Sequence, residues 1–329
     1  MTRIGLQIPN FTYPESDEPL FERIVASTVA GEHAGFDTIF VMDHFFQLPL
    51  IGAPELEMFD AYTLLGGLAA RTQTAHLGTL VTGVTYRNPA LLAKAVTALD
   101  VISNGRALLG IGAAWFELEH EALGVPFPPL AERFERLEDA IRICQGMFTR
   151  RQTTVVGTHS SVTDAWNSPA PVTPGGPPLL IGGTGERKTA RLAAQYADEW
   201  NCNASFVELP RKVEALAGHL RELGRDRDTI TMSCLATIVV GDTHADAAEK
   251  LSGMLRARGV EDPAPIVDDP DTLHTVLPRL FFGDPDEVIA QVHALMAVGL
   301  DGLVVNMPAD FHEPGAVALA GRTLTAALG

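Results

Sequence analysis

The sequence is poor in basic residues, in cysteine and in long apolar runs. Its 329 residues include 24 lysines and arginines against 41 aspartates and glutamates, which gives a formal net charge of −17. Because so acidic a protein repels phosphate backbones and anionic headgroups, we expect neither nucleic acid nor a membrane surface as a partner. Cys144, Cys202 and Cys234 are too widely spaced for a CxxC site or a disulfide framework, so we expect buried thiols.

Long apolar segments are also missing. No run approaches the roughly 18 apolar residues that a membrane-spanning helix needs. The opening residues, MTRIGLQIPNF, lack the apolar stretch of a signal peptide. Together with the cysteine usage, these absences predict a cytoplasmic protein. Hydrophobic residues still make up 46% of the chain, which is enough for a substantial core.

Short apolar runs rich in β-branched residues alternate with stretches of helical period, a pattern typical of βα units that feed a parallel sheet. Strands are predicted at 3–9, 37–43, 75–83, 106–113, 178–183, 198–203, 230–240 and 301–307. Helices are predicted near 20–34, 59–71, 89–103, 131–148, 187–197, 207–223, 243–258, 285–298 and 314–327. Such a series predicts an α/β fold, a single (β/α)8 TIM barrel over residues 1–329.

Two segments interrupt this alternation. Residues 151–177 carry period-2 alternation followed by a cluster of proline and glycine, which indicates a short hairpin and a turn inserted before the fifth barrel strand. Residues 259–284 contain four prolines and an acidic cluster, too many helix breakers for one continuous helix. The second segment fits a lid, an interface element or a solvated loop.

The active site of such a barrel forms at the C-terminal ends of its strands. The second strand runs directly into Asp43 and His44. One interpretation is structural, with Asp43 capping a turn while His44 packs. The other places His44 in the barrel mouth as a proton donor or acceptor, which suits an imidazole. A metal site is not expected, because the histidines show neither HxH nor HExxH spacing.

The fifth strand ends in a glycine-rich turn, IGGTGERK. Gly182, Gly183 and Gly185 flank Thr184 just before a predicted helix, and backbone amides at such a turn bind phosphate well. Alternatively, the glycines only make a short connection. The pattern is not GxGxxG with a following acidic residue, so a Rossmann dinucleotide site is not indicated.

The third and fourth strand ends carry further candidates. Asn88 is a predicted N-cap with Pro89 at the first helical position. Arg87 either bonds strand-end carbonyls or faces a ligand. The small residues around Gly112 allow a flat ring to approach the backbone, and Trp115 either stacks on such a ring or packs.

Taken together, these segments resemble the luciferase-like monooxygenase superfamily, and within it the branch that uses the deazaflavin coenzyme F420. The resemblance runs from residue 3 to about 308, and its most specific part is YRNPALLAK…LDVISNGRALLGIGAAW. The other matching segments are GFDTIFVMDHF, IGGTGERKTARLAAQYADEWN and DEVIAQVHALMAVGLDGLVVNMP.

The resemblance implies a barrel with the ring of the cofactor in its mouth and the phosphate of the cofactor at Gly183, Thr184 and Gly185. It further implies a non-prolyl cis peptide around Thr79, Leu80 and Val81 that supports the ring, with Asp43 and His44 beside it. The sugar-phosphate dehydrogenases of this branch carry a glutamate at the position of Trp115, so their reaction is not implied.

The expected function is therefore hydride transfer between F420 and a small organic substrate, with His44 moving a proton. The nearest alternative is an FMN-dependent monooxygenase that uses O2, because one fold serves many functions. A cofactor-binding protein without turnover and a metal-dependent barrel hydrolase are more distant alternatives. The resemblance also implies a homodimer, whereas the identity of the substrate and the direction of transfer stay open.

Overall fold

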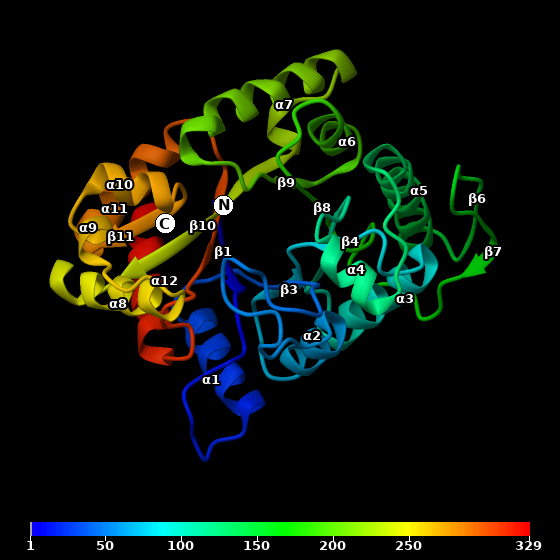
Figure 1. Ribbon diagram of the computed structural model, residues 1–329. Helices are drawn as coiled ribbons and strands as arrows, with labels where there is room; N and C mark the ends of the chain where they lie inside the picture. The colour runs from blue at the N-terminus through cyan, green and yellow to red at the C-terminus, as the bar shows by residue number, and fades with distance from the viewer. Residues whose placement is uncertain (1) are drawn as a thin grey trace.

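The structure is a computed structural model that describes residues 2–329. Eight parallel strands pair into a ring, and the pairing of the sixth with the seventh closes it (Figure 1). The predicted (β/α)8 barrel is thus confirmed. In ring order the strands are β1 (Arg3–Ile8), β2 (Thr38–Val41), β3 (His76–Thr79), β5 (Ala107–Gly112), β8 (Leu179–Gly182), β9 (Glu199–Asn201), β10 (Thr231–Val240) and β12 (Gly302–Asn306).

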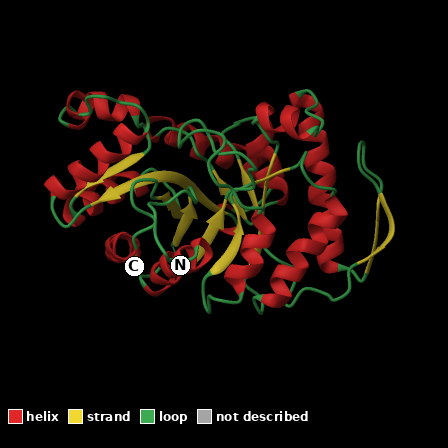
Figure 2. Ribbon diagram, turned by 60° about the horizontal axis from the view of Figure 1, so that its bottom comes forward, coloured by secondary structure: helices red, strands yellow, loops and turns green. Residues whose placement is uncertain are grey.

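Helices surround the ring (Figures 1 and 2). They are α1 (Leu20–His33), α2 (Ala61–Ala69), α3 (Pro89–Ile102), α4 (Glu117–Leu123), α5 (Leu130–Thr149), α6 (Lys188–Tyr196), α7 (Leu209–Leu223), α8 (His244–Ala257), α9 (Ala264–Val267), α10 (Pro270–Val276), α11 (Pro285–Met296) and α12 (Pro314–Leu328). Asn88 caps α3 through Ala90 N–H and Leu91 N–H, as predicted. No helix within residues 2–329 has both the length and the apolarity to span a membrane.

The strands are buried on both faces, which explains their nearly continuous apolar sequences. Outward side chains pack against the helices in one large core. A smaller cluster of Phe40, Leu80, Leu108, Leu180 and Val304 fills the inside of the ring. The barrel is therefore a packed core with a floor beneath its mouth, and Leu80 is part of that floor. All three cysteines are free and buried, as expected.

The third strand is interrupted where one continuous strand was predicted. β3 ends at Thr79, the Leu80–Val81 peptide is cis, and β4 (Thr82–Gly83) resumes pairing with β5. A cis peptide at this place is what the family resemblance implied. The strand therefore bulges at the mouth.

The two inserted segments have different structures. Residues 152–166 form the predicted hairpin, β6 (Gln152–Val155) and β7 (Val162–Trp166), which stands away from the barrel (Figures 1 and 2). Residues 264–283 form α9, α10 and one more strand, β11 (Leu280–Gly283), which pairs with the end of β10. No continuous helix forms in this segment, as predicted. The strand β11 was not predicted, because the three apolar residues Leu280, Phe281 and Phe282 are too few to show a period.

Candidate functional site

The loop after β2 brings the predicted acid and histidine to the mouth. β2 ends at Val41, so Asp43 and His44 lie beyond the strand. Their side chains therefore need not point to opposite faces of the sheet, as neighbouring side chains on a strand do. Asp43 is fully buried, and its carboxylate accepts a two-point bond from Arg87, with Nη2 at 2.6 Å and Nε at 3.0 Å. Both oxygens are thus engaged. Direct contact of Asp43 with a substrate or cofactor stays a prediction.

Arg87 connects two carboxylates. Its Nη2 also donates to Asp60, the N-cap of α2, at 2.8 Å. Burial alone would lower the pKa of Arg87, but the hydrogen bonds to Asp43 and Asp60 outweigh it and raise the pKa. The arginine therefore stays charged and ties the β2 loop to α2. The sequence left two interpretations of Arg87 open, hydrogen bonds to strand-end carbonyls or a free position that faces a ligand. The contacts of Arg87 with Asp43 and Asp60 match neither.

His44 is held by a glutamate that sequence reasoning missed. Its Nδ1 lies 2.9 Å from Oε2 of Glu119 on α4, and the imidazole is 12% exposed while the glutamate is fully buried. Glu119 Oε1 also accepts the N–H groups of Phe45 and Phe46, at 2.5 and 2.7 Å. The hydroxyl of Tyr86 donates to Glu119 Oε2. One carboxylate therefore organises the whole turn after Asp43.

The charge of Glu119 follows from these donors. Burial alone would raise its pKa, but hydrogen bonds from His44, Tyr86 and the backbone outweigh burial and lower the pKa. Glu119 is consequently an ionised, fully paired acceptor beneath the mouth.

Trp115 lies beside His44 at the predicted end of β5. The two ring centroids are 5.7 Å apart in an edge-on arrangement, and Trp115 also stacks on Phe116 at 5.1 Å. The indole is 60% exposed, so much of its surface remains open to a bound molecule. The indole of Trp115 therefore packs on Phe116 with one part of its surface and exposes the rest.

The bulge and two predicted glycines fit one another. A methyl group on Gly182 would lie 2.7 Å from a methyl of Val81, and one on Gly112 would lie 3.0 Å from the other. These glycines therefore make room for Val81. Thr79 is buried and donates to Gly110 O, so Val81 is the residue of the bulge with the most open side chain.

A line of side-chain hydrogen bonds supports the bulge from the far side of the ring. Thr237 donates to Asn306 at 2.9 Å, Asn306 donates to Gln7 at 3.2 Å, and Gln7 donates to Leu80 O at 3.0 Å. The four residues come from or directly follow β10, β12, β1 and β3. Gln7 could have been found from sequence, because it is a polar residue inside an apolar strand.

The glycine turn after β8 presents unpaired amides. Gly183 has φ +135°, and its carbonyl accepts Trp200 Nε1–H at 2.8 Å. Among the described residues, the N–H groups of Thr184, Gly185 and Glu186 have no hydrogen-bond acceptor, and no side chain caps α6. The Glu186 carboxylate points to α7, where Lys212 Nζ lies at 2.7 Å. The turn is thus suited to an anion.

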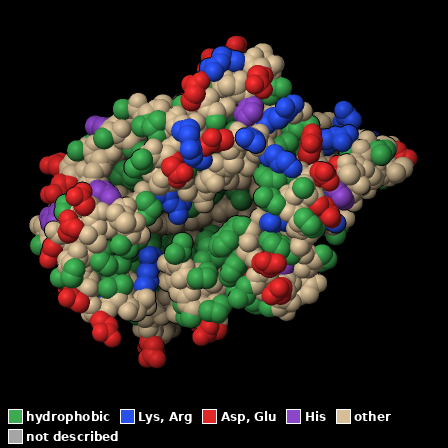
Figure 3. Space-filling model, turned by 45° about the horizontal axis from the view of Figure 1, so that its top comes forward, with side chains coloured by type: hydrophobic (Ala, Val, Ile, Leu, Met, Phe, Trp, Pro, Cys, Tyr) green, Lys and Arg blue, Asp and Glu red, His purple; other side chains and the backbone are tan. Residues whose placement is uncertain are grey.

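The predicted site residues lie on, or directly after, the adjacent strands β2, β3, β5 and β8. They therefore share one end of the ring. In the space-filling view this side is hollowed near its middle, with hydrophobic side chains along one edge (Figure 3).

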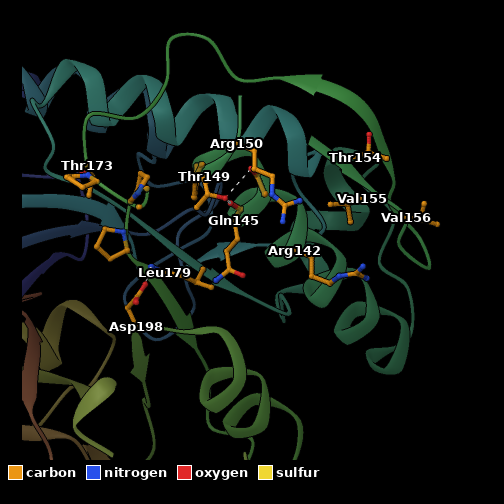
Figure 4. Close-up of a pocket in the computed structure, with 17 residues that line it drawn as sticks. Arg142, Gln145, Thr149, Arg150, Thr154, Val155, Val156, Thr173, Leu179 and Asp198 are labelled. Carbon is orange, nitrogen blue, oxygen red and sulfur yellow. Dashed lines mark hydrogen bonds between the residues drawn. The ribbon is translucent and has the colours of Figure 1, made fainter. Parts of the chain in front are cut away.

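A different pocket, of about 890 Å³, lies at the opposite end, between the last turns of α5 and the start of β8 near Asp198 (Figure 4). It holds none of the predicted site residues. Within residues 2–329, no three His, Cys, Asp or Glu side chains are grouped as metal ligands.

Comparison with known proteins assigns the family. The family model of the luciferase-like monooxygenases matches residues 2–302. The chain belongs to this family. Two solved structures, an F420-dependent secondary alcohol dehydrogenase with an F420-acetone adduct and an FMN-bound Baeyer-Villiger monooxygenase of Pseudomonas putida, both superpose with a TM-score of 0.77. Their identities are 20% and 18%, and each alignment covers at least 98% of both chains. The barrel alone therefore does not distinguish the two cofactors.

Curated relatives are more similar in sequence. An F420-dependent glucose-6-phosphate dehydrogenase of Beutenbergia cavernae is 32% identical, with 92% of this chain and 91% of the relative covered. An F420-dependent hydroxymycolic acid dehydrogenase of Mycobacterium tuberculosis is 28% identical, with 84% and 77% covered. Both relatives are named as dehydrogenases.

Proposed function

We propose that this protein is an F420-dependent oxidoreductase that transfers hydride between the deazaflavin coenzyme and a small organic substrate. The names of the curated relatives support F420 over FMN. The substrate classes in those names differ, as a sugar phosphate and a hydroxylated lipid acid, so they do not select one substrate.

The observation that carries the proposal is the pairing of an anion-binding turn with a histidine at the same end of the barrel. The unpaired amides of Thr184, Gly185 and Glu186 fit the phosphate of the coenzyme. Val81 on the bulge and Gly112 beside it offer an apolar surface for a flat ring. The open edge of His44 then lies on the side of the mouth formed by β2. These residues therefore fit a coenzyme that carries a phosphate and a flat ring, as F420 does.

Each residue has a role in this scheme. When bound, the coenzyme supplies two-electron hydride chemistry at its ring carbon C5. The turn after β8 holds the phosphate, the bulge fixes the plane of the ring, and His44 exchanges a proton with the substrate. Trp115 forms an apolar side of the space left for the substrate.

Titration of the purified protein with F420 and with FMN tests the proposal. We expect F420 to bind and quench fluorescence, and G183A to weaken binding at least tenfold, because a side chain at φ +135° distorts the turn. The matched control is G175A, which also changes a glycine of positive φ but lies in the pocket at the other end. Tight binding of FMN without binding of F420 would instead support the monooxygenase alternative.

The homodimer and the cytoplasmic location stay predictions. Analytical ultracentrifugation of the purified protein would decide the first.

A further inference from the structure

The pocket at the far end of the barrel is built largely by the inserted segment 151–177. One wall is formed by the last turns of α5, and a second by the hairpin strand β6. The third is the loop 173–178, which contains three prolines and two glycines. A (β/α)8 barrel needs neither the hairpin nor this loop. The volume of about 890 Å³ is in the range of small-molecule sites.

Two buried aspartates hold these walls in place. Asp139 accepts three backbone N–H groups of residues 158–160 at the tip of the hairpin, at 2.7 to 3.1 Å. Asp100 is fully buried and accepts the N–H groups of Val172 and Thr173, at 2.6 and 2.9 Å. Both carboxylates are thus committed to the backbone, and the walls are fixed by the chain itself.

The wall formed by α5 is polar and positively charged. Arg142, Gln145 and Thr149 follow one another at spacings of three and four, so they lie on one face of the helix. Arg150 follows at the C-cap and also lines the pocket. Two cations therefore contribute to one wall in a chain whose net charge is −17.

These two arginines lack the carboxylate partner that a neighbouring arginine has. On the same helix, Arg136 pairs with Glu132 at 2.7 Å. Within residues 2–329, the guanidinium groups of Arg142 and Arg150 form neither an ion pair nor a hydrogen bond. In Figure 4 both side chains extend toward the edge of the pocket formed by the hairpin. Their N–H groups are available to a bound anion.

The opposite side of the pocket is mostly apolar. Pro174, Pro177, Pro178 and Leu179 line it. Asp198 is an acid on this side, and its Oδ2 accepts Leu179 N–H at 2.8 Å. Figure 4 shows Asp198 across the pocket from the arginines. A bound molecule therefore meets positive charge on one side and an apolar surface on the other.

We propose that this pocket binds an organic anion of the size of a nucleotide. Its phosphate or carboxylate groups contact Arg142 and Arg150, and its flat or apolar body lies against the proline-rich loop. Guanidinium groups bind the oxygens of phosphate and carboxylate through two N–H groups at once. A bare inorganic ion would leave most of the pocket empty. The site is separate from the mouth and independent of the proposed function.

Isothermal titration calorimetry at low ionic strength tests the proposal with ADP and with citrate, which distinguish phosphate from carboxylate. We expect at least one of them to bind. R142Q and R150Q should each weaken the tighter of the two roughly tenfold, because each variant loses charge-assisted hydrogen bonds. Binding of neither anion overturns the proposal, and so does unchanged binding in both variants.

The matched control is R256Q, which changes an exposed arginine in the last turn of α8. Circular dichroism verifies that all three variants are folded. We expect R256Q to bind the anion as the wild type does. An equal loss in R256Q would show that only the overall charge matters, and this overturns the assigned site.

A further control separates this pocket from the anion-suited turn at the mouth. G183A changes that turn and should leave the binding of ADP or citrate unchanged. Weaker binding in G183A together with normal binding in R142Q and R150Q places the anion at the mouth and overturns the proposal.

Two simpler molecules test the two sides of the pocket. Pyrophosphate lacks the flat body of ADP, and adenosine lacks its charge, so each should bind roughly tenfold more weakly than ADP where ADP is the ligand. Pyrophosphate that binds as tightly as ADP overturns the role of the apolar side. Adenosine that binds as tightly as ADP overturns the role of the arginines.

Discussion

Two buried glutamates lie in different parts of the barrel and are held in opposite ways. Glu119 supports the mouth, and Glu199 lies near the other end, on β9, with 4% of its surface exposed. Glu119 accepts four donors, and its pKa is lowered. Glu199 accepts the Ser233 hydroxyl at 2.6 Å and has Arg3 Nε at 3.1 Å. Burial, followed by the nearby charges of Asp37 and Asp301, raises its pKa despite Arg3.

The difference shows that burial does not decide the charge of a carboxylate in this barrel. The number of donors and the sign of the neighbouring charges decide it. At the mouth, two backbone N–H groups and two side chains are committed to one carboxylate, and the result is a fixed negative charge beside His44. At the other end, burial raises the pKa of Glu199, although Arg3 and Ser233 both contact its carboxylate.

The largest expected effect is that of E119A. It leaves two backbone N–H groups, the imidazole and the Tyr86 hydroxyl without their acceptor, and we expect a loss of about 3–5 kcal/mol in the free energy of unfolding. E199Q, which keeps an acceptor for Ser233, should cost about 1 kcal/mol or less. Urea unfolding followed by circular dichroism measures both values. Equal losses would mean that the two glutamates are held alike.

A third buried acid extends the comparison. Asp310 follows β12, and neither of its oxygens has a hydrogen-bond donor in the described chain, although Lys250 Nζ lies 3.4 Å from Oδ2. Burial raises its pKa to about 6, against the attraction of Lys250. Its contribution to stability is therefore complete at low pH and is lost as the pH rises through about 6.

D310N should consequently stabilise the protein at pH 8 by about 3 kcal/mol and change little at pH 4. Thermal unfolding at the two pH values checks this. A gain of the same size at both would show that the effect does not arise from the ionisation of Asp310.

The smallest expected effects are in the pH dependence of unfolding. The lowered pKa of Glu119 means that its contribution is present above the ordinary pKa of about 4.3 and is lost as the pH falls further. The raised pKa of Glu199 means that its contribution is lost as the pH rises. E119Q should therefore flatten the stability curve below the ordinary glutamate pKa of about 4.3 and E199Q should flatten it above that value, each by about 1 kcal/mol. The reverse assignment would contradict the comparison.

Much of the site could be predicted because polar residues or glycines interrupt apolar strands at their ends. Asp43 and His44 end the run of β2, and the glycines of 182–185 end that of β8. The position of the bulge came only from the family resemblance, since nothing in LGTLVTGV distinguishes one peptide bond from its neighbours.

Glu119 could not be predicted from sequence. It is one of three glutamates at alternate positions, with Glu117 and Glu121, in a helix of seven residues that is too short to reveal a buried face. Its partner His44 is 75 positions earlier. Arg87 was a candidate from the sequence. Whether it contacts a ligand or supports the fold could not be predicted, because this depends on Asp60, and no local pattern connects Asp60 to Arg87.

The hydrogen-bonded line from Thr237 to Leu80 has a consequence for the order in which the mouth is completed. Gln7 and Asn306 are 299 positions apart, and Gln7 holds Leu80 O with the amide group that Asn306 orients. During synthesis the first strand leaves the ribosome long before the last one exists. A nascent chain that ends before β12 would already contain His44, Glu119 and the glycine turn, yet the side chain beneath the bulge would still lack its partner.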